Sequence, residues 1–198
     1  MIKGRKTHLV AFEQSHWPFI QKWMSETDYK YYFKNIPQVM TMGECASFPQ
    51  IMNMNILMIL ESANNQIIGM ATWDNIRILP RTCEIGFLID KDFQGRGYTK
   101  DSFMHFMNYL FSRLGFHKIS AKVAKKEFDT SGKAMWGGFT DKLILRDEFY
   151  MDGIWQDDVL LSVLEDEFKE RFIKFTQGED SWAAAEKEVV VKHLTSVH

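Results

Sequence analysis

The stretch LIDKDFQGRGYTKDSF, residues 88–103, places two glycines around Arg96, between an apolar run and the start of a helical pattern. Glycine adopts backbone conformations that other residues avoid, so Gly95 and Gly97 allow the chain to curl at this junction. The first N–H groups of a helix have no partner within it, and the helix dipole adds partial positive charge there. The junction therefore predicts either a turn whose amides cradle phosphate or a tight turn without a ligand.

This glycine turn differs from two common phosphate-binding motifs. Its Gly-Arg-Gly pattern lacks the third glycine of the dinucleotide-binding G-x-G-x-x-G motif. The separate stretch TSGKAM, residues 130–135, has a Gly-Lys pair without the upstream glycine of a P-loop, which favours an ordinary turn into a helix. A phosphate site at the glycine turn would therefore belong to another class.

An amphipathic helix is expected directly after the turn. Its apolar residues recur at the spacing of one helical face: Phe103, Phe106, Met107, Leu110, Phe111 and Leu114. Gly115 follows, where glycine commonly ends a helix. Before the turn, RTCEIGFLID (residues 81–90) carries apolar residues at both parities, which predicts a strand buried on both faces.

The other segments predict further helices and strands. SHWPFIQKWMSET, residues 15–27, indicates a helix with Ser15 as N-cap and Pro18 in the first turn. One face of this helix is apolar: Trp17, Ile20, Trp23 and Met24. Hairpins are expected around turns at Asn64–Asn65 and Asp152–Gly153. A strand is expected in residues 117–126, and short helices at about 44–52 and 130–136. This order predicts an α/β or α+β domain with a mixed sheet.

Composition excludes several classes of protein. The net charge of −2 over 198 residues gives no electrostatic basis for direct nucleic-acid binding. The two cysteines, Cys45 and Cys83, have no zinc-site spacing and no disulfide framework, which favours a reducing, cytoplasmic location. The six histidines show no ligand spacing either, so no metal is expected. No apolar run reaches the length of a membrane helix, and the N-terminus lacks the apolar region of a signal peptide.

Residues 5–167 resemble the GNAT superfamily of acyl-CoA N-acyltransferases. The likeness rests on the strand EIGFLID, the turn DFQGRGYT, the helix after it, and the later GGF followed by LILRDEFYMDGIWQDDVLLSVLEDEF. It looks most like the branch that acetylates the N-terminal alanine of ribosomal proteins, together with polyamine-acetylating relatives. The resemblance implies a mixed, mostly antiparallel central sheet flanked by helices, formed by residues 1–167.

The resemblance also implies a site for acetyl-CoA as cosubstrate. The family motif Q/R-x-x-G-x-G/A places Gln94, Gly97 and Thr99 at its fixed positions, and Thr99 departs from the usual glycine or alanine. Backbone amides along the turn are expected to hold the pyrophosphate: Gly95, Arg96, Gly97, Tyr98 and Thr99. The backbone of the preceding strand is expected to pair with the pantetheine: Phe87, Leu88 and Ile89.

Amine acetylation needs a proton acceptor, and Glu84 is the expected base because the family often has a carboxylate at this place on the strand. The alternative is a strand-edge glutamate paired with a lysine, and Asp74 is the reserve base. Two positions depart from the superfamily: Ala134 stands where a tyrosine often serves as acid, and Glu127 where an asparagine often contacts pantetheine. Hydroxyl groups that can assist, or merely cap a helix, are Tyr98, Thr130 and Ser131.

The expected acceptor is a primary amine, with a protein N-terminus first and a polyamine or other small amine next. An aromatic cluster lies where the family forms its acceptor pocket, although core packing explains it equally well: Tyr29, Tyr31, Tyr32 and Phe33. The alternative function is a GNAT-fold module with little or no turnover, which serves structure or assembly. Ala134, Glu127 and Thr99 are compatible with that alternative.

The resemblance ends before Phe168, and residues 168–198 are expected to form a helical C-terminal extension. A short helix should break at Gly178, and a second helix should follow with Ser181 as its cap. The second helix carries Trp182, Ala185 and Val189 on one face. An apolar stripe favours docking, either on the domain's own surface or on another chain. We expect this extension to be an assembly element that binds a second subunit or another protein.

Overall fold

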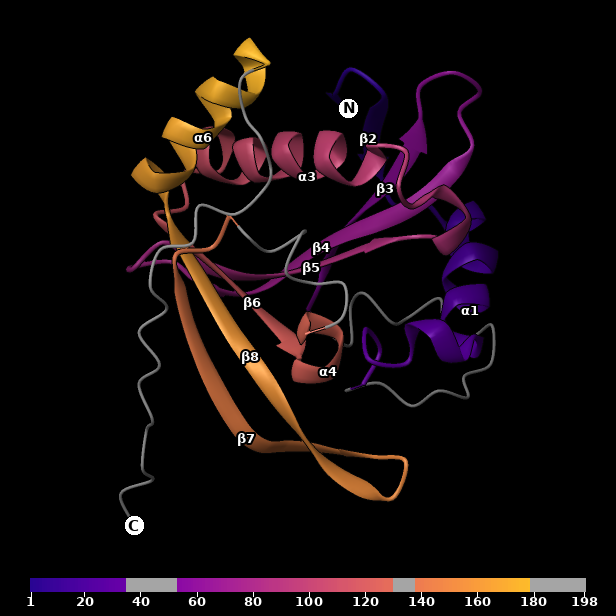
Figure 1. Cartoon of the computed structure of the whole chain (residues 1–198). Coiled ribbons are helices and arrows are strands. Elements are labelled where there is room, and N and C mark those ends of the chain that lie inside the picture. The colour runs from indigo at the N-terminus through magenta and orange to yellow at the C-terminus, as the bar shows by residue number, and fades with distance from the viewer. Residues whose placement is uncertain (35–52, 130–137, 179–198) are drawn as a thin grey trace. The chain divides into compact units, whose positions relative to one another are not determined.

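A computed structural model describes residues 1–34, 53–129 and 138–178 (Figure 1). Three predicted helices lie outside these ranges: those at about 44–52 and 130–136, and the second tail helix after Ser181. The chain divides into two compact units, residues 1–117 and 118–198, which are described separately. In the described ranges, no helix combines the length and the apolar character that a bilayer crossing requires.

The described part of the first unit contains five sheet strands, which pair antiparallel in the order β1-β2-β3-β4-β5. Its strands are β1 Ile2–Lys3, β2 Thr7–Ala11, β3 Asn55–Glu61, β4 Ile67–Arg77 and β5 Thr82–Ile89. The predicted hairpin is confirmed as β3 and β4, with Asn65 in the left-handed region at φ 60°. The register of β4 and β5 places Thr72 opposite Gly86 and Asp74 opposite Glu84.

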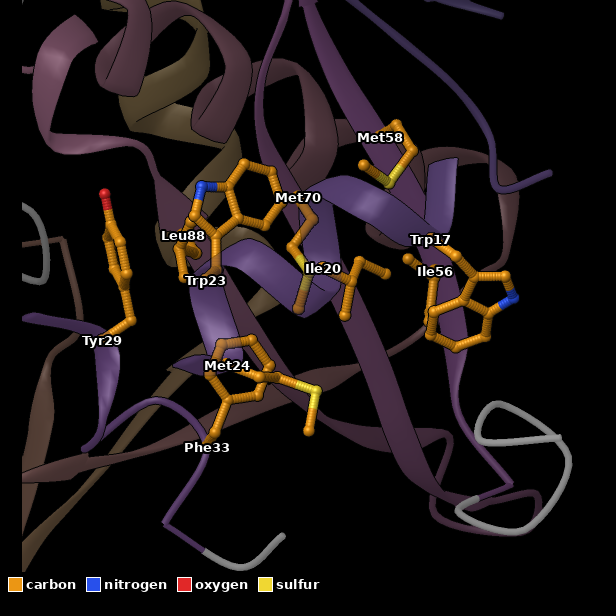
Figure 2. Packing of buried hydrophobic residues seen from close by; sticks show 10 residues of the cluster. All are labelled: Trp17, Ile20, Trp23, Met24, Tyr29, Phe33, Ile56, Met58, Met70 and Leu88. Atoms are coloured by element: carbon orange, nitrogen blue, oxygen red, sulfur yellow. The ribbon is translucent and has the colours of Figure 1, made fainter. Parts of the chain in front are cut away.

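One face of this sheet is covered by α1, Trp17–Ser25, which follows the 3-10 turn η1, Gln14–His16. The predicted apolar stripe is confirmed, since all four of its residues are buried. Figure 2 shows the Trp23 indole beside Leu88 and Met70 of the sheet, in one hydrophobic cluster. The predicted N-cap is wrong: Ser15 lies within η1, and His16 stands at the cap position because the 3-10 turn leads directly into the helix.

The other face of the sheet carries α3, Tyr98–Asn108, and the π-helical turn η4, Tyr109–Arg113. Phe87 packs edge-on against Phe103 of α3 with ring centroids 5.1 Å apart. Because side chains alternate along a strand, Phe87 points away from the face that bears Gly86 and Leu88. The predicted stripe is buried except at Leu114, which is 43% exposed. A π-turn takes one extra residue per turn, and this rotates Leu114 off the buried face.

The second unit contains a three-stranded antiparallel sheet in the order β6-β8-β7 within its described residues. Its elements are β6 Lys118–Ala124, α4 Lys125–Glu127, β7 Asp141–Met151, β8 Ile154–Leu164 and α6 Glu165–Gln177. The predicted β7–β8 hairpin is confirmed, with Asp152 and Gly153 both at positive φ, as a two-residue hairpin turn requires.

The first helix of the predicted extension is α6, and it ends at Gly178 in the left-handed conformation, as expected. Because α6 begins at Glu165, the predicted boundary between residues 167 and 168 falls inside this helix. Phe168 and Phe175 of α6 are buried. The division of the chain into a 1–167 domain and a 168–198 extension therefore stays a prediction.

Candidate active site

The glycine turn joins β5 to α3 through the short 3-10 turn η3, Lys91–Phe93. Gly95 and Gly97 have φ values of 75° and 83°, in the region that favours glycine, and Gly97 is the N-cap residue of α3. A Cβ at Gly95 would meet no atom within 4 Å, so backbone conformation alone requires glycine there. All residues from Gln94 to Gly97 are exposed.

The amide N–H groups of Gly95, Arg96 and Gly97 have no hydrogen-bond partner within the described part of the chain. They are exposed at the N-terminal end of an eleven-residue helix. Unpaired amides and the positive end of a helix dipole together suit an anion. The role of this turn in holding phosphate stays a prediction.

Three side chains hold the glycine turn in place. Gln94 folds back, and its Nε2 donates to the carbonyl of Ile89, 3.0 Å away, at the end of β5. The Nζ of Lys6 donates to the carbonyl of Arg96 at 2.9 Å. The Tyr98 hydroxyl donates to the Glu61 carboxylate on β3, and this hydrogen bond raises the pKa of Tyr98. Gln94 therefore shapes the turn through its side chain.

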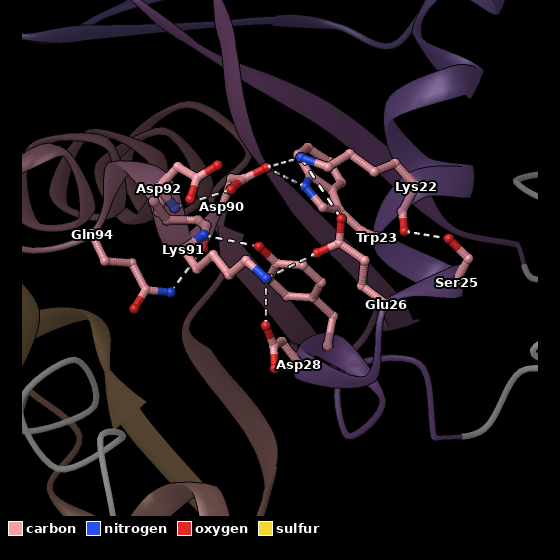
Figure 3. Close-up of polar contacts among 11 residues, drawn as sticks. Lys22, Trp23, Ser25, Glu26, Asp28, Asp90, Lys91, Asp92 and Gln94 are labelled. Carbon is pink, nitrogen blue, oxygen red and sulfur yellow. Dashed lines mark hydrogen bonds and ion pairs between the residues drawn. The ribbon is translucent and has the colours of Figure 1, made fainter.

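A buried carboxylate, Asp90, anchors the start of the same turn to α1 (Figure 3). Its Oδ2 accepts from Trp23 Nε1 at 2.9 Å and from Lys22 Nζ at 3.0 Å, and its Oδ1 accepts from the Asp92 amide at 3.1 Å. Burial alone would raise the pKa of Asp90, but these hydrogen bonds together lower it. The Asp90 carboxylate is thus ionised and paired where β5 ends.

We expect Asp90→Asn to lower the free energy of unfolding by about 1–3 kcal/mol at pH 7, because charge-assisted hydrogen bonds are lost. The pKa of Asp90 is lowered by folding, so its contribution is present above the ordinary aspartate pKa and is lost as pH falls through the folded value. Urea unfolding at several pH values measures the difference in the free energy of unfolding between the wild type and Asp90→Asn. Asp92→Asn is the matched control, since the Asp92 carboxylate is exposed and only its amide is used. An equal loss in both variants would contradict the anchoring role.

Lys91 connects the turn to the 3-10 segment η2, Thr27–Tyr29. The Lys91 amide donates to the Tyr29 hydroxyl at 2.9 Å, and its Nζ lies 2.6 Å from Asp28 Oδ2 and 3.5 Å from Glu26 Oε2. Burial raises the pKa of Tyr29 to about 12. Of the predicted aromatic cluster, Tyr29 and Phe33 are buried in the hydrophobic cluster with α1, so these two serve the core (Figure 2).

The catalytic candidate Glu84 lies on β5 directly opposite Asp74 on β4. Its Oε2 accepts from Asn75 Nδ2 at 3.3 Å, and no lysine pairs with it among the described residues. Asp74 is half-buried, and burial, followed by the nearby charge of Glu84, raises the pKa of Asp74 to about 6. The structure therefore brings together two carboxylates that the sequence considered separately. Only the hairpin register, which depends on a bulge after Asp74, could have shown this pairing.

Comparisons with known proteins decide the family. A model described as "Acetyltransferase (GNAT) domain" matches residues 6–137. The chain belongs to the GNAT acetyltransferase family. This confirms the resemblance at the level of the superfamily.

Two curated relatives illustrate the range of the family. The spermidine N(1)-acetyltransferase of Vibrio cholerae is 26% identical over 113 residues, which cover 57% of this chain and 65% of the relative. The "Putative ribosomal N-acetyltransferase YdaF" of Bacillus subtilis is 26% identical over 106 residues, 54% of this chain and 58% of the relative. The chain thus matches less than two thirds of the length of these relatives. Their names span polyamine and ribosomal acceptors, so they leave the ribosomal branch unconfirmed.

Solved structures of GNAT proteins share the fold. The spermidine N-acetyltransferase from Vibrio cholerae, solved with CoA and spermine, has a TM-score of 0.74 at 20% identity and covers 83% of this chain and 98% of that one. A GNAT acetyltransferase from Bacillus anthracis has a TM-score of 0.69 at 18% identity, with the same coverage of both chains. They confirm the predicted class, a mixed, mostly antiparallel sheet flanked by helices.

Most residues predicted for the site lie along one continuous segment of the GNAT fold. Phe87, Leu88 and Ile89 form the buried end of β5, with Phe87 directed at α3 and Leu88 at the α1 cluster. The turn and the first residues of α3 follow directly. Glu127 lies in α4 of the second unit, whereas Ala134, Thr130 and Ser131 lie outside the described residues. Among the residues that the structure describes, no group of three or more potential ligands could hold a metal ion.

Proposed function

We propose that the protein is an N-acetyltransferase that moves an acetyl group from acetyl-CoA to a primary amine. The observation that carries the proposal is the glycine turn, whose unpaired amides lie at the start of α3 in a chain of the GNAT family. In this proposal the amides from Gly95 to Thr99 hold the pyrophosphate. The backbone of Phe87, Leu88 and Ile89 pairs with the pantetheine, as the family resemblance implies.

The acceptor in this proposal is a cationic amine, with a polyamine as the first candidate and a protein N-terminus as the second. A relative that acetylates spermidine supports the first, and one named for ribosomal acetylation supports the second. The two carboxylates on β4 and β5 suit either acceptor, because both carry an ammonium group near neutral pH. Both acceptors require the amine to lose a proton before it attacks the thioester.

The test incubates the full chain with acetyl-CoA and either spermidine or a peptide with N-terminal alanine. We expect one free CoA thiol for each acetylated amine, followed by thiol titration and mass spectrometry. Calorimetry with acetyl-CoA alone is run beside it. Binding without transfer to either amine would favour the inactive-module alternative, and the absence of binding would contradict the whole proposal. The cytoplasmic location stays a prediction.

We also propose that residues 168–198 form an assembly extension. A chain that ends at Gly178 keeps all of α6, including the buried Phe168 and Phe175. If the extension joins subunits through its last twenty residues, the shortened chain should show a lower mass in light scattering while it still binds acetyl-CoA. An unchanged mass, or a full-length chain that is monomeric and finds no partner, would contradict assembly through this segment.

A further inference from the structure

Two carboxylates face each other across β4 and β5 without a described counter-charge. Asp74 and Glu84 are cross-strand partners in the antiparallel register, so their side chains lie on the same side of the sheet. Like charges in this position repel and destabilise a sheet. The pair therefore does not stabilise the fold, and a cationic ligand would reduce the repulsion between the two carboxylates.

The two carboxylates differ in what they contact. Glu84 is held by Asn75, which has a positive φ of 46° at the irregularity in β4 where the register shifts. A bulge of this kind re-aims side chains and occurs often beside active sites. The Asp74 carboxylate makes no hydrogen bond or ion pair within the described residues, although the residue is half-buried. Asp74 is therefore the carboxylate available to a ligand.

A buried hydroxyl belongs to the same polar cluster. The Tyr32 oxygen is buried and makes no hydrogen bond of ordinary geometry to a described residue. A Cβ at Gly86 would lie 2.6 Å from Thr72 Oγ1 and 2.8 Å from the Tyr32 oxygen, so Gly86 leaves the space that these groups occupy. Burial raises the pKa of Tyr32, and Asp74 adds to this, while the Thr72 hydroxyl acts in the opposite direction.

After burial, the nearby charge of Glu84 favours the protonated form of Asp74. Glu84 faces it from β5, and Tyr32 lies near it from the segment after η2. Burial first, and then the charges of Asp74 and Glu84, raise the pKa of Cys83 to about 12, so this thiol stays neutral beside the pair. A carboxylate that titrates at about 6 is well matched to accept a proton near neutral pH.

We propose that Asp74, and not Glu84, is the general base that deprotonates the acceptor amine, with Glu84, its cross-strand partner, as the positioning residue. This assignment rests on the proposed acetyltransfer function. The ammonium group gives one proton to the Asp74 carboxylate, and the nitrogen lone pair then attacks the acetyl carbonyl carbon. The N–C bond forms and the C–S bond breaks. The CoA thiolate takes the second nitrogen proton, and Asp74 later releases its proton to water.

The test compares Asp74→Asn and Glu84→Gln with the wild type, with spermidine and acetyl-CoA from pH 5 to pH 9. The wild-type kcat/KM should fall on the acid side with an apparent pKa near that of Asp74. Asp74→Asn should lower kcat about 10²–10⁴-fold and remove this acid limb, with an unchanged KM for acetyl-CoA. Glu84→Gln should keep the limb but shift it to lower pH, with less than about a tenfold loss of kcat. Asp92→Asn is the control and should match the wild type.

A second readout does not depend on turnover. Folding raises the pKa of Asp74, so its contribution to stability is full below the ordinary aspartate pKa and is lost as pH rises through about 6. Asp74→Asn should therefore melt at a higher temperature than the wild type at pH 8 and at the same temperature below pH 4.

Several results would overturn the assignment. A normal rate and an intact acid limb in Asp74→Asn would exclude Asp74, and loss of the limb in Glu84→Gln would make Glu84 the base. A wild-type chain that binds acetyl-CoA but acetylates no amine would overturn the proposed function, and the role of Asp74 with it. In an active wild type, failure of the Asp74→Asn prediction refutes this inference alone.

Discussion

Replacing Gly97 with glutamate is expected to weaken acetyl-CoA binding about 100-fold or more. Gly97 is the N-cap of α3, and its unpaired amide is among those proposed to hold the pyrophosphate. A carboxylate there sets a negative charge against phosphate, and such like-charge contacts cost several kcal/mol, where 1.4 kcal/mol is tenfold in affinity. The φ of 83° adds strain for any residue with a Cβ. Calorimetry with acetyl-CoA measures the loss.

Two controls separate charge from strain at Gly97. Gly97→Ala adds the Cβ, which would lie 3.1 Å from the flexible Lys6 Nζ, without the charge. It should retain most of the affinity. Gly115→Glu adds the same side chain at a similar φ of 71° beyond the other end of the α3–η4 helix, in open space. If Gly97→Glu folds and binds as tightly as Gly115→Glu, the phosphate site is elsewhere.

The second large effect is expected at Asp101, a 5%-exposed residue in the first turn of α3. Its carboxylate accepts from the amides of Arg5, Lys6 and Thr7, each at 2.9 Å, and from the Thr7 hydroxyl at 2.7 Å. Asp101→Ala removes four charge-assisted hydrogen bonds and leaves donors without a partner. We expect the free energy of unfolding to fall by about 3–5 kcal/mol in urea denaturation.

Asp166→Ala is the matched control for Asp101. Asp166 also lies in the first turn of a helix, α6, but its side chain is 95% exposed. Its removal should change the free energy of unfolding by less than about 0.5 kcal/mol. A loss below about 1 kcal/mol in Asp101→Ala would show that water replaces the carboxylate. In Asp101→Ala, the segment that leads into β2 would also become less ordered. The hydrogen bond from Lys6 to the Arg96 carbonyl, which holds the glycine turn, would weaken as a result.

The type and place of most elements could be predicted from the sequence because their signals are local. The apolar spacing of α1 and the glycines before α3 each act over a few residues, and the structure confirms both elements. The same local reasoning was wrong at Ser15 and Leu114. The 3-10 turn before α1 and the π-turn after α3 have a different number of residues per turn from an α-helix, and apolar spacing does not reveal this.

The sequence by itself determined that a strand, a glycine turn and a helix follow one another, since periodicity and glycine content decide what the backbone can do locally. Only the tertiary structure decided which polar groups meet. Asp101 binds amides 94 to 96 positions away, and Asp90 binds an indole 67 positions away. Asp74 meets Glu84 only because a bulge and the strand register align them. Such pairings depend on how distant segments pack, and local sequence patterns do not predict that packing.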